Sequence, residues 1–298
     1  MIGIILAGGS GTRLYPLTQV TSKQLLPVYD KPMIYYPLSV LMEAGIKDIV
    51  IISTPQDIDR MRQLLGIGAR YGINIDYMIQ KEPNGIAEAF LIAEKYITRT
   101  GSCEPVTLIL GDNIFAGNGL SQKIKNAIYD AYSGKGSTIF GYYVEDPERF
   151  GVVEFDKKDG NVISIEEKPS NPKSNYCITG LYVYDNKVLE YTKSLKPSKR
   201  KELEITDLNK IYLDNNELNV ELLGQGFTWI DAGTHESLAE ATSFVKTIEK
   251  HQHRKIACLE EIAYKNSWIC KSDLIYLATL YNNQYGQYLL DIARGKYH

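Results

Sequence analysis

The sequence lacks a long apolar run. Crossing a bilayer takes about 20 consecutive apolar residues, and the apolar segment at the start of the chain, Met1 to Ala7, ends at Gly8. No basic stretch precedes that segment, as a secretory signal would require. We therefore expect no membrane partner and a cytoplasmic location.

Cysteine and histidine are scarce, with four of each in 298 residues. Cys103, Cys177, Cys258 and Cys270 form no C-x-x-C pair, and neither they nor the histidines have the spacing of zinc ligands. We expect these cysteines to be reduced thiols. No serine or cysteine is placed with histidine in a pattern that would predict a nucleophilic active site.

Neither sign of charge dominates the chain. The 33 lysines and arginines are set against 36 aspartates and glutamates, which leaves a formal net charge of -3. Such a chain has no general attraction to nucleic acid or to an anionic membrane. We expect no nucleic-acid partner, and any phosphate binding must come from a local cluster of charges.

A glycine-rich segment follows the first apolar run and supplies such a cluster. Gly8, Gly9 and Gly11 can adopt positive φ and present bare backbone N–H groups to an anion. Arg13 adds a planar donor suited to phosphate, and Lys23 adds a mobile point charge. The combination predicts a polyphosphate ligand.

Two familiar phosphate-binding loops are excluded by spacing. A P-loop ends in Gly-Lys-Ser/Thr, whereas Thr12, Arg13 and Leu14 stand at those positions after Gly8. A dinucleotide fingerprint that began at Gly9 would need glycine in place of Leu14.

The first half of the chain alternates apolar runs with amphipathic segments, which is typical of a parallel sheet with crossover helices. The predicted strands are 1–7, 48–53, 73–80 and 105–110. The predicted helices include one that follows Thr54-Pro55 and ends at Gly66, and one over 86–97. Ligands of such sheets bind at the carboxyl ends of the strands. Gly8, Gln80 and Asp112 fall at three of those ends.

From Ser137 the pattern changes to short strands joined by turns, which predicts an antiparallel lobe. Its expected strands are 137–144, 150–156, 161–168 and 176–184. Thr206 and Asp207 are expected to cap the next helix. We predict an α/β domain over 1–240, with the β lobe within about 137–230, and a helical C-terminal region over 241–298 that carries exposed tyrosines at its end.

The glycine loop and the segment after it resemble a known family. The segments LAGGSGTRLYPLT and SKQLLPVYDKPMIYYPL are similar to the signature of the sugar-1-phosphate nucleotidylyltransferases, in particular the short bacterial thymidylyltransferases of the dTDP-rhamnose type, which serve cell-surface polysaccharide biosynthesis. The resemblance runs from Ile2 to about Ile269. It implies a Rossmann-like nucleotidyltransferase core with a mixed, mainly parallel sheet, an antiparallel sugar-binding lobe and a helical C-terminal region.

The resemblance also implies a reaction. In this family dTTP and glucose 1-phosphate give dTDP-glucose and pyrophosphate, with Mg²⁺ as cofactor. A homotetramer with a second, allosteric nucleotide-sugar site at a subunit interface is implied too, but that site is not assigned to residues here.

Two other functions stay open. One is an enzyme that uses UTP or another sugar phosphate, and the other is a non-catalytic nucleotide-sugar sensor. The chain retains all five residues to which the resemblance gives catalytic roles, and binding alone would not need every one of these charges. The five are Arg13, Lys23, Asp112, Lys168 and Asp231.

The resemblance assigns further residues to three sites. The nucleotide site takes Leu6, Gly8, Gly9, Ser10, Gly11, Thr12, Arg13, Lys23, Gln24, Gln80, Pro83, Gly85 and Asp112. The sugar-phosphate site takes Gly151, Glu167, Lys168 and Ile178. Asp112 and Asp231 are the implied metal ligands, and carboxylate oxygens completed by phosphates and water suit Mg²⁺.

Each of these charged residues also has a plainer interpretation. Asp112 and Asp231 could shape turns or cap helices, and Lys168 could belong to a solvated charge cluster.

Gln80 carries an amide that both donates and accepts, as the imide edge of thymine or uracil requires. Where the family commonly reads Pro-Asp-Gly-Leu-Ala-Gln, residues 83–88 of this chain are PNGIAE, which leaves the base preference open.

Overall fold

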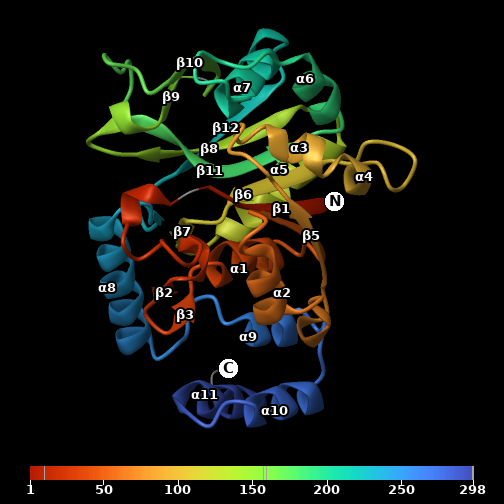
Figure 1. The fold of residues 1–298 in the computed structure, drawn as a ribbon, viewed down its shortest axis with the longest axis vertical. Coiled ribbons are helices and arrows are strands. Elements are labelled where there is room, and N and C mark those ends of the chain that lie inside the picture. Colours follow the sequence, from red (N-terminus) through yellow and green to blue (C-terminus); the bar gives the residue numbers. More distant parts are fainter. Residues whose placement is uncertain (10, 157, 159, 297–298) are drawn as a thin grey trace.

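A computed structural model describes residues 1–9, 11–156, 158 and 160–296 of the chain. At its centre lies a nine-stranded mixed sheet between helices (Figure 1). The strands are β1 (Ile2–Ala7), β4 (Asp48–Ser53), β5 (Asn74–Ile79), β6 (Val106–Leu110), β8 (Ser137–Tyr143), β9 (Gly151–Phe155), β10 (Val162–Glu167), β11 (Tyr176–Tyr184) and β12 (Leu218–Leu223). Their order is β10-β9-β11-β6-β1-β4-β5, and β8 joins β11 to β12.

The parallel half of the sheet consists of β6, β1, β4 and β5. Leu6 lies opposite Leu110 in the register, and Ala7 lies opposite Ser53. The carboxyl ends of these strands are therefore level, and the segments that follow them emerge at one edge of the sheet. Gly8 follows β1 and Gln80 follows β5 at this edge.

Strand β1 is covered on both faces, which explains its unbroken apolar sequence. Ile2, Ile4 and Leu6 belong to one hydrophobic core, and Ile5 and Ala7 belong to the core on the opposite face. This is the alternation that a strand imposes on successive side chains.

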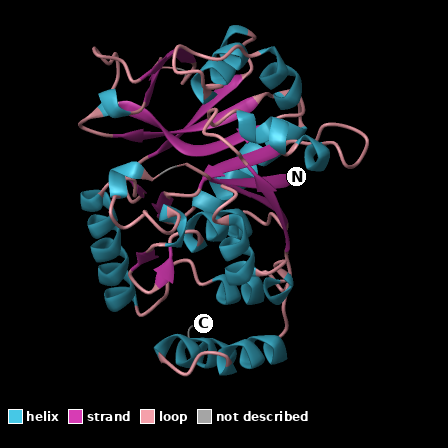
Figure 2. Ribbon diagram, in the orientation of Figure 1, coloured by secondary structure: helices cyan, strands magenta, loops and turns pink. Residues whose placement is uncertain are grey.

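Helices cover both faces of the sheet (Figure 2). They are α1 (Tyr35–Glu43), α2 (Ile58–Leu65), α3 (Glu88–Ile92), α4 (Glu94–Ile97), α5 (Leu120–Tyr132), α6 (Val188–Ser194), α7 (Ile205–Asp214), α8 (His235–Gln252), α9 (Leu259–Lys265), α10 (Lys271–Thr279) and α11 (Gln284–Ala293). Residues of α3, α4, α6 and α7 share a core with Ile4, and residues of α1, α2, α5 and α9 to α11 share the other core with Ile5. Among the described residues, no helix is both long and apolar enough to span a membrane.

Strand β11 connects the two halves of the sheet. Along one edge it pairs antiparallel with β8, and along the other edge it pairs antiparallel with β6 near its carboxyl end and with β9 at Cys177. The lobe of β8 to β12 thus extends the same sheet, at the end of the molecule opposite α10 and α11 (Figure 1). The predicted fold class is confirmed, including the antiparallel strands and the C-terminal helices.

Two small sheets lie outside the central one. β7 (Asn113–Ala116) pairs antiparallel with β13 (Thr228–Asp231), with Asn113 opposite Asp231. β2 (Pro27–Val28) pairs antiparallel with β3 (Lys31–Pro32).

Three local predictions were wrong. The helix expected over 86–97 is two short helices, α3 and α4. The Ala87 N–H donates to the Leu203 carbonyl (3.1 Å), which holds the start of the segment outside the helix. The backbone then leaves the helical region at Ala93, which separates α3 from α4. Thr206 does not cap α7; it lies inside that helix, and its hydroxyl donates to Glu167 instead (2.5 Å).

The third wrong prediction concerns the terminal tyrosines, which are not exposed. Tyr288 is buried and donates to Glu261 (2.6 Å), and Tyr285 donates to Glu260 (2.7 Å). Glu260 and Glu261 are themselves buried, so these hydroxyls satisfy carboxylates that packing has removed from water. The division at residue 240 falls inside α8 and stays a prediction.

Candidate active site

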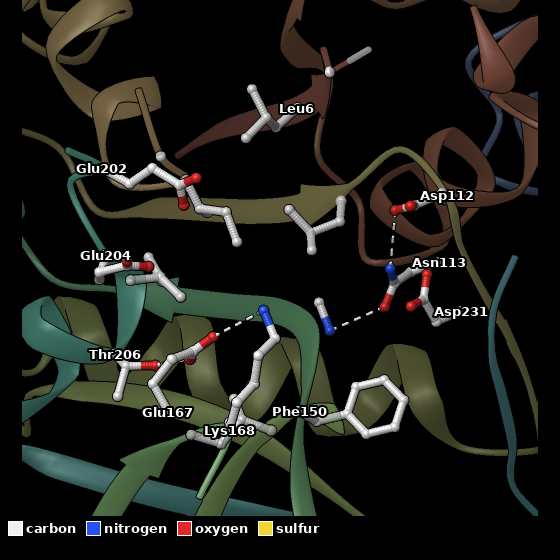
Figure 3. A pocket seen from close by; sticks show the side chains of 18 of the residues that line it. Leu6, Asp112, Asn113, Phe150, Glu167, Lys168, Glu202, Glu204, Thr206 and Asp231 are labelled. Atoms are coloured by element: carbon white, nitrogen blue, oxygen red, sulfur yellow. Dashed lines mark hydrogen bonds and ion pairs between the residues drawn. The ribbon is translucent and has the colours of Figure 1, made fainter. Parts of the chain in front are cut away.

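A cleft of about 350 Å³ lies between the edge of the parallel strands and the antiparallel lobe. Thirteen of the residues that the sequence suggested line it: Leu6, Gly8, Gly9, Arg13, Gln80, Pro83, Gly85, Asp112, Gly151, Glu167, Lys168, Ile178 and Asp231. Figure 3 shows Asp112, Asn113 and Asp231 grouped on one side of this cleft, and Glu167 and Lys168 across from them.

The glycine loop forms one wall of the cleft. Gly9 (φ 104°) and Gly11 (φ 59°) have left-handed backbone conformations that side chains disfavour. Thr18 donates its hydroxyl to the Gly11 carbonyl (2.7 Å) and fixes the end of the loop. Ser10 lies outside the described residues.

Arg13 leaves this loop toward the second aspartate. A Cβ added at Gly233 would lie 2.9 Å from Arg13 Nη2 and 3.2 Å from Asp231 Oδ1, so both groups lie beside the same glycine. A side chain at residue 233 would require the Arg13 guanidinium to shift. Arg13 and Asp231 thus belong to one cluster.

Four residues that the sequence assigned to the nucleotide do not line the cleft: Gly11, Thr12, Lys23 and Gln24. Lys23 lies behind the wall and forms an ion pair with Asp112. Gln24 is buried and accepts a hydrogen bond from Ser22 (3.1 Å). In this structure Lys23 therefore acts on the cleft through Asp112.

The small sheet of β7 and β13 brings the two distant aspartates together. Asp231 ends β13 and lies opposite Asn113, which begins β7 directly after Asp112. The backbone N–H of Ala232 donates to the Asp112 carbonyl (3.0 Å) and continues the pairing past the strand end. Asp231 is not a helix cap, since Thr234 and Ser237 form the capping box of α8.

Asn113 holds Asp112 in place. Its Oδ1 accepts from Trp229 Nε1 (2.6 Å) and from the Gly180 N–H (3.0 Å), and its Nδ2 donates to Asp112 Oδ1 (3.2 Å). Two donors on the oxygen leave only the nitrogen to face the carboxylate. The sequence prediction missed Asn113 and Trp229, although Asn113 directly follows a predicted ligand.

The two aspartates have opposite electrostatic environments. Burial opposes ionisation of Asp112, but the charge of Lys23 and the hydrogen bonds from Lys23 and Asn113 outweigh it and hold the Asp112 pKa below its usual value. Burial and the charge of Asp112 raise the pKa of Asp231 to about 6, against the opposing effects of Lys23 and Arg13. A pair of carboxylates that repel each other in this way is a favourable site for a cation.

The donor set fits a hard divalent cation only in part. Within the described residues, no group of three or more histidine, cysteine, aspartate or glutamate side chains could hold a metal ion. Two carboxylates are the protein share expected for Mg²⁺, which keeps several waters and takes other ligands from substrate phosphates. Asp112 and Asp231 are the residues that could hold it.

Across the cleft, Lys168 extends from the loop after β10. Its φ of 45° is unusual for a residue with a side chain and costs about 1–2 kcal/mol. Its N–H donates to the Phe150 carbonyl (3.0 Å), which holds this conformation. Lys168 Nζ lies 3.2 Å from Glu167 Oε1, and strain at a cleft residue favours a functional role over a solvated loop.

Glu167 is oriented by residues that the sequence prediction did not include. Thr206 donates to its Oε2 (2.5 Å), and Arg200 Nη2 lies 3.7 Å from its Oε1. Arg200 also pairs with Glu204 (2.8 Å) and lies 3.5 Å from Glu202. These four residues line the cleft. The dense charge of the segment RKELE, residues 200–204, was the signal that could have found Arg200, Glu202 and Glu204.

Comparisons with known proteins show the family of this chain. The model of the nucleotidyl transferase family matches residues 2–248. A glucose-1-phosphate thymidylyltransferase from Neisseria meningitidis is 55% identical over 295 residues, which cover 99% of this chain and 100% of the relative. The chain belongs to the nucleotidyl transferase family.

Two other members of the nucleotidyl transferase family are also similar to this chain over most of its length. A glucose-1-phosphate thymidylyltransferase from Xanthomonas campestris is 55% identical over 298 residues, with 99% of this chain and 98% of the relative covered. A solved Bacillus anthracis structure, described as a glucose-1-phosphate thymidylyltransferase in complex with a sucrose, has a TM-score of 0.73 at 41% identity and covers 82% of this chain and 95% of that one. The family predicted from the glycine loop is therefore confirmed.

Proposed function

We propose that this nucleotidyl transferase moves a deoxythymidylyl group from dTTP to glucose 1-phosphate and releases pyrophosphate. The observation that carries the proposal is the cleft itself, in which Asp112 and Asp231 face Lys168 and Arg13 lies beside Asp231. The near-full-length relatives support it, because they are glucose-1-phosphate thymidylyltransferases.

The reaction needs alignment and charge neutralisation rather than a base. A phosphate oxygen of glucose 1-phosphate is already anionic and attacks the α-phosphorus of dTTP. The new P–O bond forms as the bond to the bridging oxygen of pyrophosphate breaks, in line with the attack. Holding both anions in this geometry is the main contribution that the protein can make.

The charged residues of the cleft divide this work. Arg13 binds the triphosphate beside the glycine loop. Lys23, which is paired with Asp112 behind the cleft wall, would support the departing pyrophosphate by turning from Asp112 toward it. Lys168 positions the attacking phosphate, and Glu167, held by Thr206, binds the sugar hydroxyls together with backbone groups at Gly151 and Ile178. Asp112 and Asp231 would hold Mg²⁺, which when bound neutralises charge that develops on the phosphates.

The nucleoside would lie against the wall formed by Gly8, Gln80, Pro83 and Gly85, since these residues follow β1 and β5 at one edge of the cleft. Gln24 would contribute near the deoxyribose, although it is buried behind this wall. We also propose a homotetrameric assembly and a cytoplasmic location.

Pyrophosphate release with dTTP and glucose 1-phosphate tests the proposal. We expect dTTP to be used best, UTP appreciably and purine triphosphates poorly, because one missing hydrogen-bond match costs about 1–3 kcal/mol, or at least tenfold. A preference for UTP would favour a uridylyltransferase, and binding without any release would favour a sensor. Equal rates with dTTP and ATP would contradict the assignment of the base site.

A further inference from the structure

The amide of Gln80 is held by a neighbouring carboxylate. Gln80 Nε2 donates to Glu88 Oε2 (2.8 Å) and to the Gly85 carbonyl (3.3 Å), so both of its hydrogens are used. The other oxygen of Glu88 accepts from Asn84 Nδ2 (2.9 Å). Glu88, the first residue of α3, therefore receives one amide N–H on each oxygen.

This arrangement determines which end of the Gln80 amide faces the ligand. A carboxylate accepts hydrogen bonds and cannot donate one, so the nitrogen of Gln80 must face Glu88. The carbonyl oxygen is turned the opposite way, toward the glycine loop. A Cβ added at Gly8 would lie 2.9 Å from Gln80 Oε1, and both residues line the cleft.

The surrounding backbone keeps this arrangement rigid. Gln80 is buried, and its N–H continues the sheet by donating to the Ser53 carbonyl (2.9 Å). The segment that carries Gly85 is fastened at both ends to Leu203, which donates to the Asn84 carbonyl (2.6 Å) and accepts from the Ala87 N–H (3.1 Å). The acceptors of the Gln80 amide are therefore fixed before a ligand binds.

We propose that Glu88 is a positioning residue for base selection. By fixing the Gln80 carbonyl toward the nucleotide, it makes the site select a pyrimidine whose ring carries an imide N–H. Thymine and uracil have this donor at N3, whereas cytosine has an acceptor there and would face the carbonyl oxygen with no hydrogen between them. This inference rests on the proposed function, because it takes the base to lie at Gln80.

The test compares kcat/KM for dTTP and dCTP, with glucose 1-phosphate as the second substrate. We expect the wild type to favour dTTP by at least about tenfold. Glu88→Ala removes the charged acceptor and leaves only the longer hydrogen bond to the Gly85 carbonyl (3.3 Å) to orient the Gln80 amide. The dTTP:dCTP ratio of kcat/KM should therefore contract by about tenfold, through a lower kcat/KM for dTTP and a higher one for dCTP. Glu88→Gln can still accept from Gln80, but its amide can also donate, so it should restore the ratio only in part.

The matched control is Glu82→Ala. Glu82 is an exposed carboxylate of the same loop, and it is not among the described residues that bind the Gln80 amide. Its replacement removes the same charge and should leave the ratio unchanged. A purely structural role for Glu88 would lower both rates together and leave the ratio where it was.

Equilibrium binding of dTTP and dCTP, measured by calorimetry, gives the same ratio without turnover. If the wild type forms no dTDP-glucose but Glu88→Ala shifts the binding ratio, the proposed function fails and the role of Glu88 stands. If dTDP-glucose is formed and Glu88→Ala keeps the wild-type ratio in both measurements, the role of Glu88 is wrong. Equal use of dTTP and dCTP by the folded wild type would also overturn it.

Discussion

The two sides of the cleft hold their charges in different ways. On the side of the parallel strands, Asp112 is buried, and its Lys23 partner has a side chain only 16% exposed. On the side of the lobe, the side chains of Lys168 and Arg200 are 49% and 48% exposed, and Arg200 lies within 4 Å of three carboxylates. One side is a fixed network inside the protein, and the other is a set of half-solvated pairs.

This difference indicates how each side contributes. Leaving a buried charge unpaired is costly, so the buried charges of the strand side keep their positions without a ligand. The strand side is therefore already arranged for the triphosphate and its cation before they bind. Half-exposed ion pairs are worth little in water, so Lys168 and Arg200 can exchange their carboxylates for a phosphate at small cost. The strand side therefore supplies alignment and the lobe side supplies adaptable binding.

The largest effect is expected from the paired aspartates. Asp112→Asn or Asp231→Asn should lower turnover by at least ~100-fold, the scale of losing a main electrostatic contact of the transition state. Both variants should fold, but Asp112→Asn leaves the charge of Lys23 unpaired and should be the less stable of the two. The double variant should be little worse than either single variant, because the two carboxylates act as one unit. Steady-state kinetics at limiting and saturating Mg²⁺ measure this.

Asp130→Asn is the control for charge removal, because Asp130 lies on α5 and pairs with Lys135 at the surface. It should change turnover by less than about twofold. Near-normal turnover of Asp112→Asn and Asp231→Asn at limiting Mg²⁺, or full activity of the wild type in a chelator, would contradict the metal site. Asp112 and Asp231 would then only shape the backbone turns in which they lie.

A smaller effect is expected on the lobe side. Lys168→Ala removes one charge-assisted contact to the sugar phosphate and should lower kcat/KM for glucose 1-phosphate by about tenfold to a hundredfold. The affinity for dTTP should stay unchanged, since Lys168 lies across the cleft from Asp231, and Arg13 lies beside Asp231 at Gly233. Lys173→Ala is the control, because Lys173 pairs with Glu166 outside the cleft (2.9 Å). An equal loss of dTTP affinity would show that the two sides of the cleft do not bind separate substrates.

The packing under the strand side can be tested through stability. A Cβ at Gly180 would lie 2.6 Å from Asn113 Oδ1 and 2.8 Å from Leu110 Cδ1. Gly180→Ala should therefore lower the free energy of unfolding by about 1–3 kcal/mol through overpacking, measured by urea denaturation. At Gly224 a new Cβ would have no heavy atom of the described residues within 4 Å, so Gly224→Ala should change the free energy of unfolding by less than about 1 kcal/mol. Similar values for the two variants would mean that Asn113 is loosely held.

The smallest effect is expected from the half-exposed pairs themselves. Arg200→Gln should change the free energy of unfolding by less than about 1 kcal/mol despite its three carboxylate neighbours, because solvent screens pairs of this kind. Urea denaturation at low and high salt would measure the change. A loss of several kcal/mol would show that the lobe side is as fixed as the strand side.

The sequence alone determined the features that depend on neighbouring residues. Apolar runs predicted β4 and β11 to the residue, and the glycines before Arg13 predicted the loop that forms one wall of the cleft, because strand periodicity and turn chemistry act over a few residues. The resemblance to the family then suggested Asp112, Lys168 and Asp231, all of which line the cleft.

Only the tertiary structure decided which distant groups meet. The pairing of β7 with β13 sets Asp231 beside Asp112, and α7 turns Thr206 toward Glu167 rather than toward its own helix end. The same is true of Glu88, whose contact with Gln80 depends on how residues 83–88 fold back against Leu203. Such contacts depend on the burial and hydrogen bonding of the whole chain, which no local pattern contains.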